Sequence, residues 1–124
     1  MSDCAFCKIA TNGQSWVLKH EAVTAEYEIV SFKPFGALNP GHRIFVPVRH
    51  VVGAEEDPEL TGRCFREAAI WAGQRRGWAM GEGPPFNLHV NSGHAAGQRV
   101  DHLHIHYVPR ASGDGIRVLA KGDQ

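Results

Sequence analysis

Histidine alternates with apolar residues in one short segment of this 124-residue chain, residues 101–108, which reads Asp-His-Leu-His-Ile-His-Tyr-Val. The histidines are His102, His104 and His106, and the spacers are Leu103, Ile105 and Tyr107. Such spacers suit a β-strand. Because side chains of a strand alternate between its faces, the three imidazoles share one face and the spacers share the other. We therefore expect a strand that packs on one face and carries groups titrating near neutral pH on the other.

Three uses of this histidine row are open. Unrelated packing is one, although strict alternation of three histidines by chance is improbable. A metal site is another, because histidines two apart on a strand stand about 6.7 Å from each other and two could share one zinc ion. The outer pair is about 13 Å apart, which makes a single ion for all three awkward. The third use is acid–base or nucleophilic chemistry on an anion, since a neutral imidazole is a good nucleophile and a protonated one binds phosphate.

The stretch that leads into the row favours chemistry on phosphate. Residues 91–100 read Asn-Ser-Gly-His-Ala-Ala-Gly-Gln-Arg-Val. A glycine-bearing turn before a strand can present backbone N–H groups to a phosphate. Gln98 and Arg99 add side-chain donors at the same place.

These residues resemble the histidine triad (HIT) family, whose signature is alternating histidine and apolar residues after a Gly-Gln-x-Val lead-in. Two further segments resemble the same family in the same order: residues 39–50, which read Asn-Pro-Gly-His-Arg-Ile-Phe-Val-Pro-Val-Arg-His, and residues 4–9, which read Cys-Ala-Phe-Cys-Lys-Ile. The resemblance implies an α+β fold over a single HIT domain, residues 1–124: a HIT-like antiparallel β-sheet of about five strands with one main helix packed on it. It also implies a homodimer.

The resemblance implies a role for each histidine of the row. The middle one, His104, would attack the α-phosphate of a nucleotide conjugate and form a transient nucleotidyl-histidine, which water then hydrolyses. His106 would donate a hydrogen bond or proton to the phosphate or leaving group, and His102 would orient His104 through its backbone carbonyl. His42 matches a further histidine near the site, although a solvent-exposed residue at a strand start is an equal reading. The substrate class is nucleoside phosphoramidates, acyl nucleotides or dinucleoside polyphosphates.

Other residues match family positions that contact a nucleotide. Around ribose and phosphate these are Asn91, Gly97, Gln98 and Val100, and around the base they are Phe6, Ile9 and Phe32. From the residues alone, the three apolar ones are indistinguishable from core.

The chain also departs from the family at two positions. Arg99 stands where the family often has serine or threonine, and we expect it among the nucleotide-binding residues, facing an anionic leaving group. Pro34 stands where many members carry an acidic residue that binds ribose, which puts nucleotide preference in doubt.

A structural zinc ion is the cofactor that the resemblance implies. Cys4 and Cys7 have metal-ligand spacing but complete no site alone. His50 and His102 occupy the positions from which some bacterial members supply two histidine ligands. A reduced thiol pair and a redox Cys-x-x-Cys compete with this reading, the latter weakly because no βαβ pattern surrounds it. Cys64 is expected in a helix core.

Periodic runs and breaks predict one long helix and about five strands. Asp57 caps the helix and Pro58 takes its first position. Apolar residues at helical spacing extend it to about residue 79; they are Leu60, Cys64, Ala68, Trp71 and Ala72. Strands are expected over residues 15–20, 25–33, 43–48, 86–90 and 100–109. The first two could form a hairpin, and a short helix or turn is expected over residues 4–10. This pattern favours α+β with an antiparallel sheet.

Composition excludes some classes of function. Thirteen basic and thirteen acidic residues give a formal net charge of zero, so no overall field favours a nucleic-acid polymer or a membrane surface. The chain contains no apolar run of the roughly 20 residues that span a membrane. Three cysteines, an odd number, without a secretory signal argue against a disulfide framework, and the expected location is the cytoplasm.

A nucleotide small molecule is thus the expected partner. Two other functions remain open: a nucleotide-binding protein with little turnover, and a metal-dependent enzyme that uses the histidine row directly.

Overall fold

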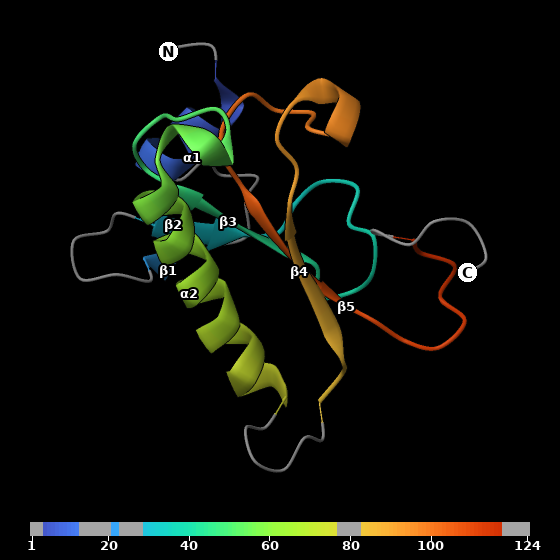
Figure 1. Cartoon of the computed structure of the whole chain (residues 1–124). Helices are drawn as coiled ribbons and strands as arrows, with labels where there is room; N and C mark the ends of the chain where they lie inside the picture. The colour runs from blue at the N-terminus through green and yellow to red at the C-terminus, as the bar shows by residue number, and fades with distance from the viewer. Residues whose placement is uncertain (1–3, 13–20, 23–28, 77–82, 118–124) are drawn as a thin grey trace.

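The computed structural model describes residues 4–12, 21–22, 29–76 and 83–117. Five strands form one antiparallel sheet in the order β1-β2-β3-β5-β4 (Figure 1). The strands are β1 (Glu21–Ala22), β2 (Ile29–Phe32), β3 (Arg43–Pro47), β4 (Phe86–Val90) and β5 (Ile105–Pro109). The helices are α1 (Ala5–Asn12) and α2 (Pro58–Arg76), with short 3-10 turns η1 (Ala54–Glu56) and η3 (His94–Ala96). The predicted α+β class with one main helix on an antiparallel sheet is confirmed.

The long helix α2 packs on one face of the sheet. Alternate residues of the strands join its buried side in one cluster, which contains Ile29, Phe45, Val51, Leu60, Cys64, Ala68, Ala72, Leu103, Ile105 and Tyr107. The three spacers of the histidine row thus all pack on this face, as their alternation predicts. Cys64 is fully buried here, as expected.

The opposite face carries α1 and the histidines. Strand residues of the other parity pack with α1 in a second cluster of buried side chains, which contains Ile9, Ala10, Val30, Phe32, Ile44 and Val46. Ile44 of β3 lies directly opposite His106 of β5, so the row continues the same face beyond this cluster. The face under α2 is therefore hydrophobic core. On the opposite face, the half under α1 is core and the half formed by the β5 segment carries the histidines.

The start of α2 follows the sequence prediction. Asp57 Oδ1 accepts a hydrogen bond from the backbone N–H of Leu60 at 3.0 Å, which satisfies a donor that the first helical turn leaves without a partner. Buried positions recur every four residues along one side, at Leu60, Cys64, Ala68 and Ala72. The described helix ends at Arg76, and the predicted extension to residue 79 lies outside the described residues.

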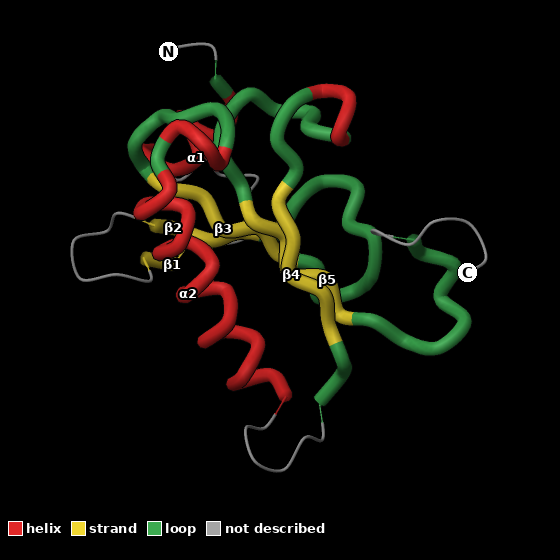
Figure 2. Tube along the Cα trace, viewed as in Figure 1, coloured by secondary structure: helices red, strands yellow, loops and turns green. Residues whose placement is uncertain are grey.

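The predicted strand over residues 100–109 is wrong in its first half. Strand β5 begins only at Ile105, and Figure 2 shows the chain entering it from a loop. The reason is that the backbone is engaged elsewhere: Leu103 N–H donates to Val51 O at 2.7 Å, and His102 N–H donates to Val100 O at 2.8 Å. Neither bond belongs to the sheet ladder, so His102 and His104 are held by a loop.

The remaining strands agree with expectation where the structure describes them. β4 has the predicted bounds, and β3 ends one residue earlier than predicted. β2 begins within the predicted strand over residues 25–33 and ends one residue before its predicted end. It pairs antiparallel with β1, a two-residue strand that lies between the two strands predicted there. The predicted strand over residues 15–20 lies outside the described residues.

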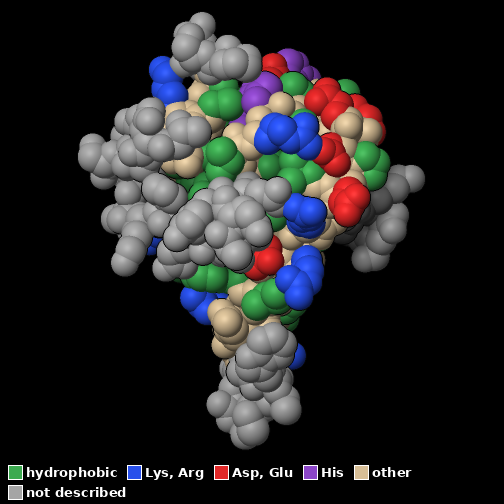
Figure 3. Space-filling model, turned by 90° about the vertical axis from the view of Figure 1, so that its left-hand side faces the viewer, with side chains coloured by type: hydrophobic (Ala, Val, Ile, Leu, Met, Phe, Trp, Pro, Cys, Tyr) green, Lys and Arg blue, Asp and Glu red, His purple; other side chains and the backbone are tan. Residues whose placement is uncertain are grey.

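Charge on the surface is mixed. On the face shown in Figure 3 both signs are present, with acidic side chains mostly toward the upper right and basic side chains spread across the face. Within the described residues, no helix has the length and apolar character needed to cross a bilayer.

Candidate functional site

Four histidines meet on the face of the sheet opposite α2. His104 lies in the loop just before β5 and His106 in β5 itself, and their ring centroids lie 4.9 Å apart. His42, from the turn before β3, and His89, from β4, each lie against His106, with centroids at 5.3 and 4.5 Å. The structure therefore places His42 beside the row, buried and not in solvent.

The backbone fixes the tautomer of His104. Its Nδ1 lies 2.7 Å from the carbonyl oxygen of His102, which can only accept, so Nδ1 carries the proton. Nε2 of a neutral His104 is then a free lone pair. A single hydrogen bond thus leaves this ring with one nucleophilic nitrogen.

A second hydrogen-bond chain fixes the tautomer of His106. The backbone N–H of Leu38 donates to His42 Nδ1 at 3.0 Å, so the proton of His42 is on Nε2. His42 Nε2–H then donates to His106 Nδ1 at 3.0 Å. His106 consequently carries its proton on Nε2, where it is a donor beside His104.

Burial keeps these imidazoles neutral. It lowers the pKa of His42 to about 4 and that of His106 to about 3, and in both cases repulsion from neighbouring histidines adds to the effect. Burial also lowers the pKa of His104, against a smaller opposing effect of its bond to the His102 carbonyl. A neutral His104 is the form that a nucleophile requires.

His89 is a member of this cluster that the sequence reasoning missed. It is paired with His106 in the register of β4 and β5, and the two rings are stacked at an interplanar angle of 11°. The signal available in the sequence was its position in a predicted strand, two residues before Asn91. That position alone does not show which strand lies beside it.

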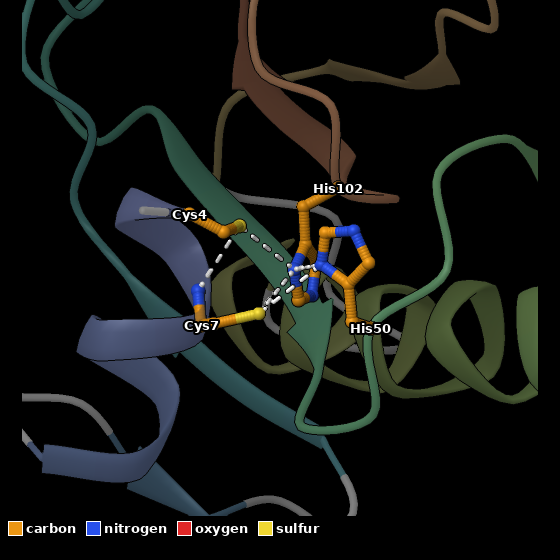
Figure 4. Close-up of side chains that lie close together, drawn as sticks. All are labelled: Cys4, Cys7, His50 and His102. Atoms are coloured by element: carbon orange, nitrogen blue, oxygen red, sulfur yellow. Dashed lines mark hydrogen bonds between the residues drawn. The ribbon is translucent and has the colours of Figure 1, made fainter. Parts of the chain in front are cut away.

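The four predicted metal ligands converge at the other end of the row. Figure 4 shows Cys4, just before α1, and Cys7, in α1, pointing toward His50, which follows β3, and His102, which precedes β5. One ligand atom from each lies within 4.8 Å of all the others. Residues 98 positions apart in the chain are thereby brought together.

The donor set fits a tetrahedral zinc ion. His102 Nε2–H donates to Pro47 O at 2.8 Å, which leaves Nδ1 as a lone pair facing the cluster. This Nδ1 lies 3.4 Å from Cys4 Sγ, 3.5 Å from Cys7 Sγ and 3.2 Å from His50 Nδ1. A tetrahedral Zn²⁺ site with two sulfur and two nitrogen ligands has ligand–ligand distances of roughly 3.3–3.8 Å.

The chemistry of the thiols also suits a cation. Burial, together with the hydrogen bond and the charge of Cys4, raises the pKa of the Cys7 thiol to about 11. A thiol with its pKa raised in this way does not ionise unaided at neutral pH, whereas a bound metal ion deprotonates a thiol that coordinates it.

The three residues proposed for the base divide into two groups. Ile9 and Phe32 are each 1% exposed and belong to the core cluster under α1. Phe6 is half-buried, and its ring packs edge-on against His104 with centroids 5.0 Å apart. Only Phe6 of the three can therefore meet a ligand directly in this conformation.

The residues proposed for ribose and phosphate form a loop between β4 and β5. Gln98 is buried and holds this loop: its Oε1 accepts from Gly93 N–H at 2.7 Å, and its Nε2 donates to Val52 O and Val100 O at 2.8 and 3.0 Å. Gly97 has a φ of +100°, which favours glycine. The side chain of Gln98 thus acts on the shape of the loop.

The remaining loop residues differ in exposure. Asn91 and Val100 are half-buried, and Arg99 is exposed. Gly97 lies beside Asn91, since a Cβ on this glycine would stand 3.5 Å from Asn91 Nδ2. The structure brings Asn91 and Gly97 together and leaves the Arg99 side chain in solvent.

Comparison with known proteins is consistent over most of the chain. Residues 17–113 match the HIT domain family. The chain is 30% identical over 115 residues to an uncharacterized HIT-like protein of Methanocaldococcus jannaschii, covering 90% of this chain and 82% of that protein. It is 36% identical over 115 residues to the adenylylsulfatase HINT3 of Arabidopsis thaliana, covering 91% of this chain and 55% of that longer protein. A HIT family protein from Bacillus anthracis has a TM-score of 0.76 at 27% identity, covering 98% of this chain and 83% of the other.

Proposed function

The chain belongs to the HIT family, and on that premise we propose that it is a nucleotide hydrolase or transferase that acts at an α-phosphate through a nucleotidyl-histidine on His104. The observation that carries this proposal is the 2.7 Å hydrogen bond between His104 Nδ1 and the His102 carbonyl. It holds the proton on the nitrogen that faces the backbone and leaves Nε2 as the nucleophile.

The reaction follows from the two fixed tautomers. His104 Nε2 forms a bond to the α-phosphorus as the bond from phosphorus to the leaving group breaks, and that electron pair departs with the leaving group. His106 Nε2–H donates a hydrogen bond to the phosphate or the departing atom. Water, or another acceptor in a transferase, then attacks phosphorus and releases His104. Dividing one displacement into two is the gain of covalent catalysis.

Substrates of this class carry a nucleoside monophosphate joined to a second group. Nucleoside phosphoramidates, acyl nucleotides and dinucleoside polyphosphates all qualify. The 36% identity to a protein named adenylylsulfatase supports testing nucleotidyl sulfates as substrates as well. Phe6 would meet the base, and Asn91 and Gly97, which lie side by side, would meet the ribose and phosphate.

The test is substitution of the nucleophile. We expect His104→Asn to lower turnover about a thousandfold or more, because asparagine cannot form the covalent intermediate. The same variant should still bind a nucleoside monophosphate, as measured by titration calorimetry. His94→Asn is the matched control, since His94 has a side chain 77% exposed. Turnover within a few fold of wild type in His104→Asn would contradict the assignment.

Experiments on the same purified protein distinguish the proposed enzyme from two other functions. A nucleotide-binding protein with little turnover would bind the monophosphate and show no acid-labile phosphohistidine. An enzyme that uses a metal ion on the histidine row would lose activity with a chelator even where its fold is retained. Chelator-resistant turnover with a trapped nucleotidyl-histidine supports the proposed mechanism against both.

We also propose one structural zinc ion per chain, held by Cys4, Cys7, His50 and His102. The ion, when bound, would supply a closed tetrahedral link and no reactive position. Metal analysis of protein purified without a histidine tag should give close to one equivalent, and a chelator should lower the melting temperature. A Cys7→Ser variant should show neither the metal nor the chelator effect. A wild type without zinc and with an unchanged melting temperature would leave the cysteines as a thiol pair.

We propose further that the protein forms a homodimer and is located in the cytoplasm. Strand β4 is the last strand of the sheet, and within the described residues its outer edge pairs with no other strand. Exposed edges of this kind are available to a second copy. Sedimentation velocity measures this directly, and a monomer at all concentrations would contradict it.

A further inference from the structure

His89 stands beside the proposed reaction centre and has no assigned role. It lies directly opposite His106 across the β4–β5 ladder, and the two rings are stacked with centroids 4.5 Å apart. Only 9% of its surface is exposed. Since residues paired in register project from the same face of a sheet, the His89 ring points to the side that carries His104 and His106.

The nitrogens of His89 are not used by the part of the protein that the structure describes. Its Nδ1 is buried without a hydrogen-bond partner. A buried N–H without a partner costs more than a lone pair in the same place, so the proton belongs on Nε2. Burial, with repulsion from His104, lowers the pKa of His89, and the ring is therefore a neutral donor.

The order of the strands places His89 relative to a bound nucleotide. Phe6, the ligand-accessible member of the proposed base pocket, packs on Phe32 of β2. From β2 the sheet continues through β3 and β5 to β4, so His104 and His106 lie between the base side and His89. A nucleotide with its base near Phe6 and its α-phosphate at His104 extends its leaving group toward β4.

We propose that His89 Nε2–H donates a hydrogen bond to the leaving group, and so selects substrates whose leaving group carries an acceptor oxygen, as phosphate, sulfate and carboxylate do. This inference rests on the proposed function, because it takes the position of the phosphate from His104. An apolar side chain would fill the same place on β4 without burying a polar atom that has no partner. The donor is explained when a substrate supplies the acceptor.

Two substitutions separate the hydrogen bond from the ring stack. His89→Gln removes the ring but keeps an N–H near the place of Nε2, whereas His89→Phe keeps a ring against His106 and removes the donor. Rates are compared on adenylyl sulfate, whose leaving group carries acceptor oxygens, and on adenosine 5′-phosphoramidate, whose leaving group is an amine. Melting temperatures of both variants show that they are folded.

We expect His89→Phe to lower kcat/KM for adenylyl sulfate by about tenfold or more, the usual effect of one hydrogen bond, and to leave the phosphoramidate rate nearly unchanged. His89→Gln should keep most of the rate on adenylyl sulfate. Equal losses on the two substrates in His89→Phe, or no loss on either, would overturn the proposal.

A binding comparison keeps this inference separate from the proposed reaction. Calorimetric affinities are measured for AMP, which lacks a leaving group, and for α,β-methylene-ADP, which has one that cannot depart. His89→Phe should weaken only the second, by about tenfold. A wild type that binds both without turnover overturns the proposed function and leaves this comparison valid. Equal weakening of both ligands overturns the role of His89.

Discussion

Three histidines of one motif have three different surroundings. His102 donates Nε2–H to Pro47 O and turns Nδ1 toward two cysteines. His104 donates Nδ1–H to the His102 carbonyl. His106 accepts from His42 and keeps its own proton on Nε2. The same side chain is thus suited to three proposed roles, metal ligand, nucleophile and donor, because a different neighbour holds one nitrogen of each ring.

Arg99 is the residue of the loop that a substitution can test most directly. Its side chain is exposed beside residues of the proposed phosphate loop, and a guanidinium can bind an anionic group through two parallel bonds. We expect Arg99→Ser to lower kcat/KM for an anionic leaving group several-fold and to leave the rate for a neutral amine unchanged. The ratio of the two rates is the measurement. A ratio equal to that of wild type would remove Arg99 from the mechanism.

At the scale of elements, the side of α2 that packs on the sheet carries small residues. Ala68 and Ala72 are fully buried there, one turn apart. We expect Ala68→Leu to reduce the free energy of unfolding by about 1–3 kcal/mol, because the added atoms have no space against the strands. Ala69→Leu adds the same atoms at the next position, which is exposed, and should change stability by less than about 0.5 kcal/mol. Urea unfolding of both variants gives the two values, and equal effects would contradict the packing argument.

The elements that local chemistry specifies were predicted well. The cap at Asp57, the spacing of the buried face of α2 and the bounds of β4 all follow from residues close in sequence. The start of β5 was predicted wrongly, because Leu103 N–H donates to Val51 O, 52 positions away in the chain. The residues from 100 to 104 contain no signal of that bond. Long-range backbone bonds override a local strand preference.

The candidate site was predictable to the extent that a motif carried it. The family resemblance pointed to His42, and the structure places it at 3.0 Å from His106. His89 escaped because its importance depends on the pairing of β4 with β5 in one register. Ile9 and Phe32 were assigned to the base pocket by the family resemblance, but both lie in the core. From the sequence alone, an apolar residue of a ligand pocket cannot be distinguished from an apolar residue of the core.

At the scale of the whole molecule, the proposed zinc site and the proposed nucleophile share one residue. His102 faces Cys4, Cys7 and His50 with its ring, and its carbonyl holds the tautomer of His104. The site therefore joins α1, the segment after β3 and the segment before β5 at the point where His104 begins to project. The residue that would hold the metal with its ring therefore also holds the proposed nucleophile with its backbone carbonyl.

Acid should destabilise the folded chain through its buried histidines. The pKa of His42 is about 4 and that of His106 about 3 in the folded protein, against about 6.5 in an unfolded chain. Below about pH 6.5 the unfolded chain therefore binds protons that the folded chain does not. The free energy of unfolding is unaffected by these two histidines above about pH 6.5 and decreases as the pH is lowered toward 4. Melting temperatures between pH 8 and pH 4 measure this decline.

Matched variants assign that decline to the cluster. His106→Gln removes one titrating group from the buried set and should make the melting temperature less dependent on pH between 6.5 and 4. His94→Gln removes a histidine whose side chain is 77% exposed, and should leave the dependence as in wild type. All four proposed metal ligands are intact in both variants, so acid release of a bound metal would affect the two variants equally. If His94→Gln flattened the profile as much as His106→Gln, the loss of stability in acid would have to come from groups outside the histidine cluster.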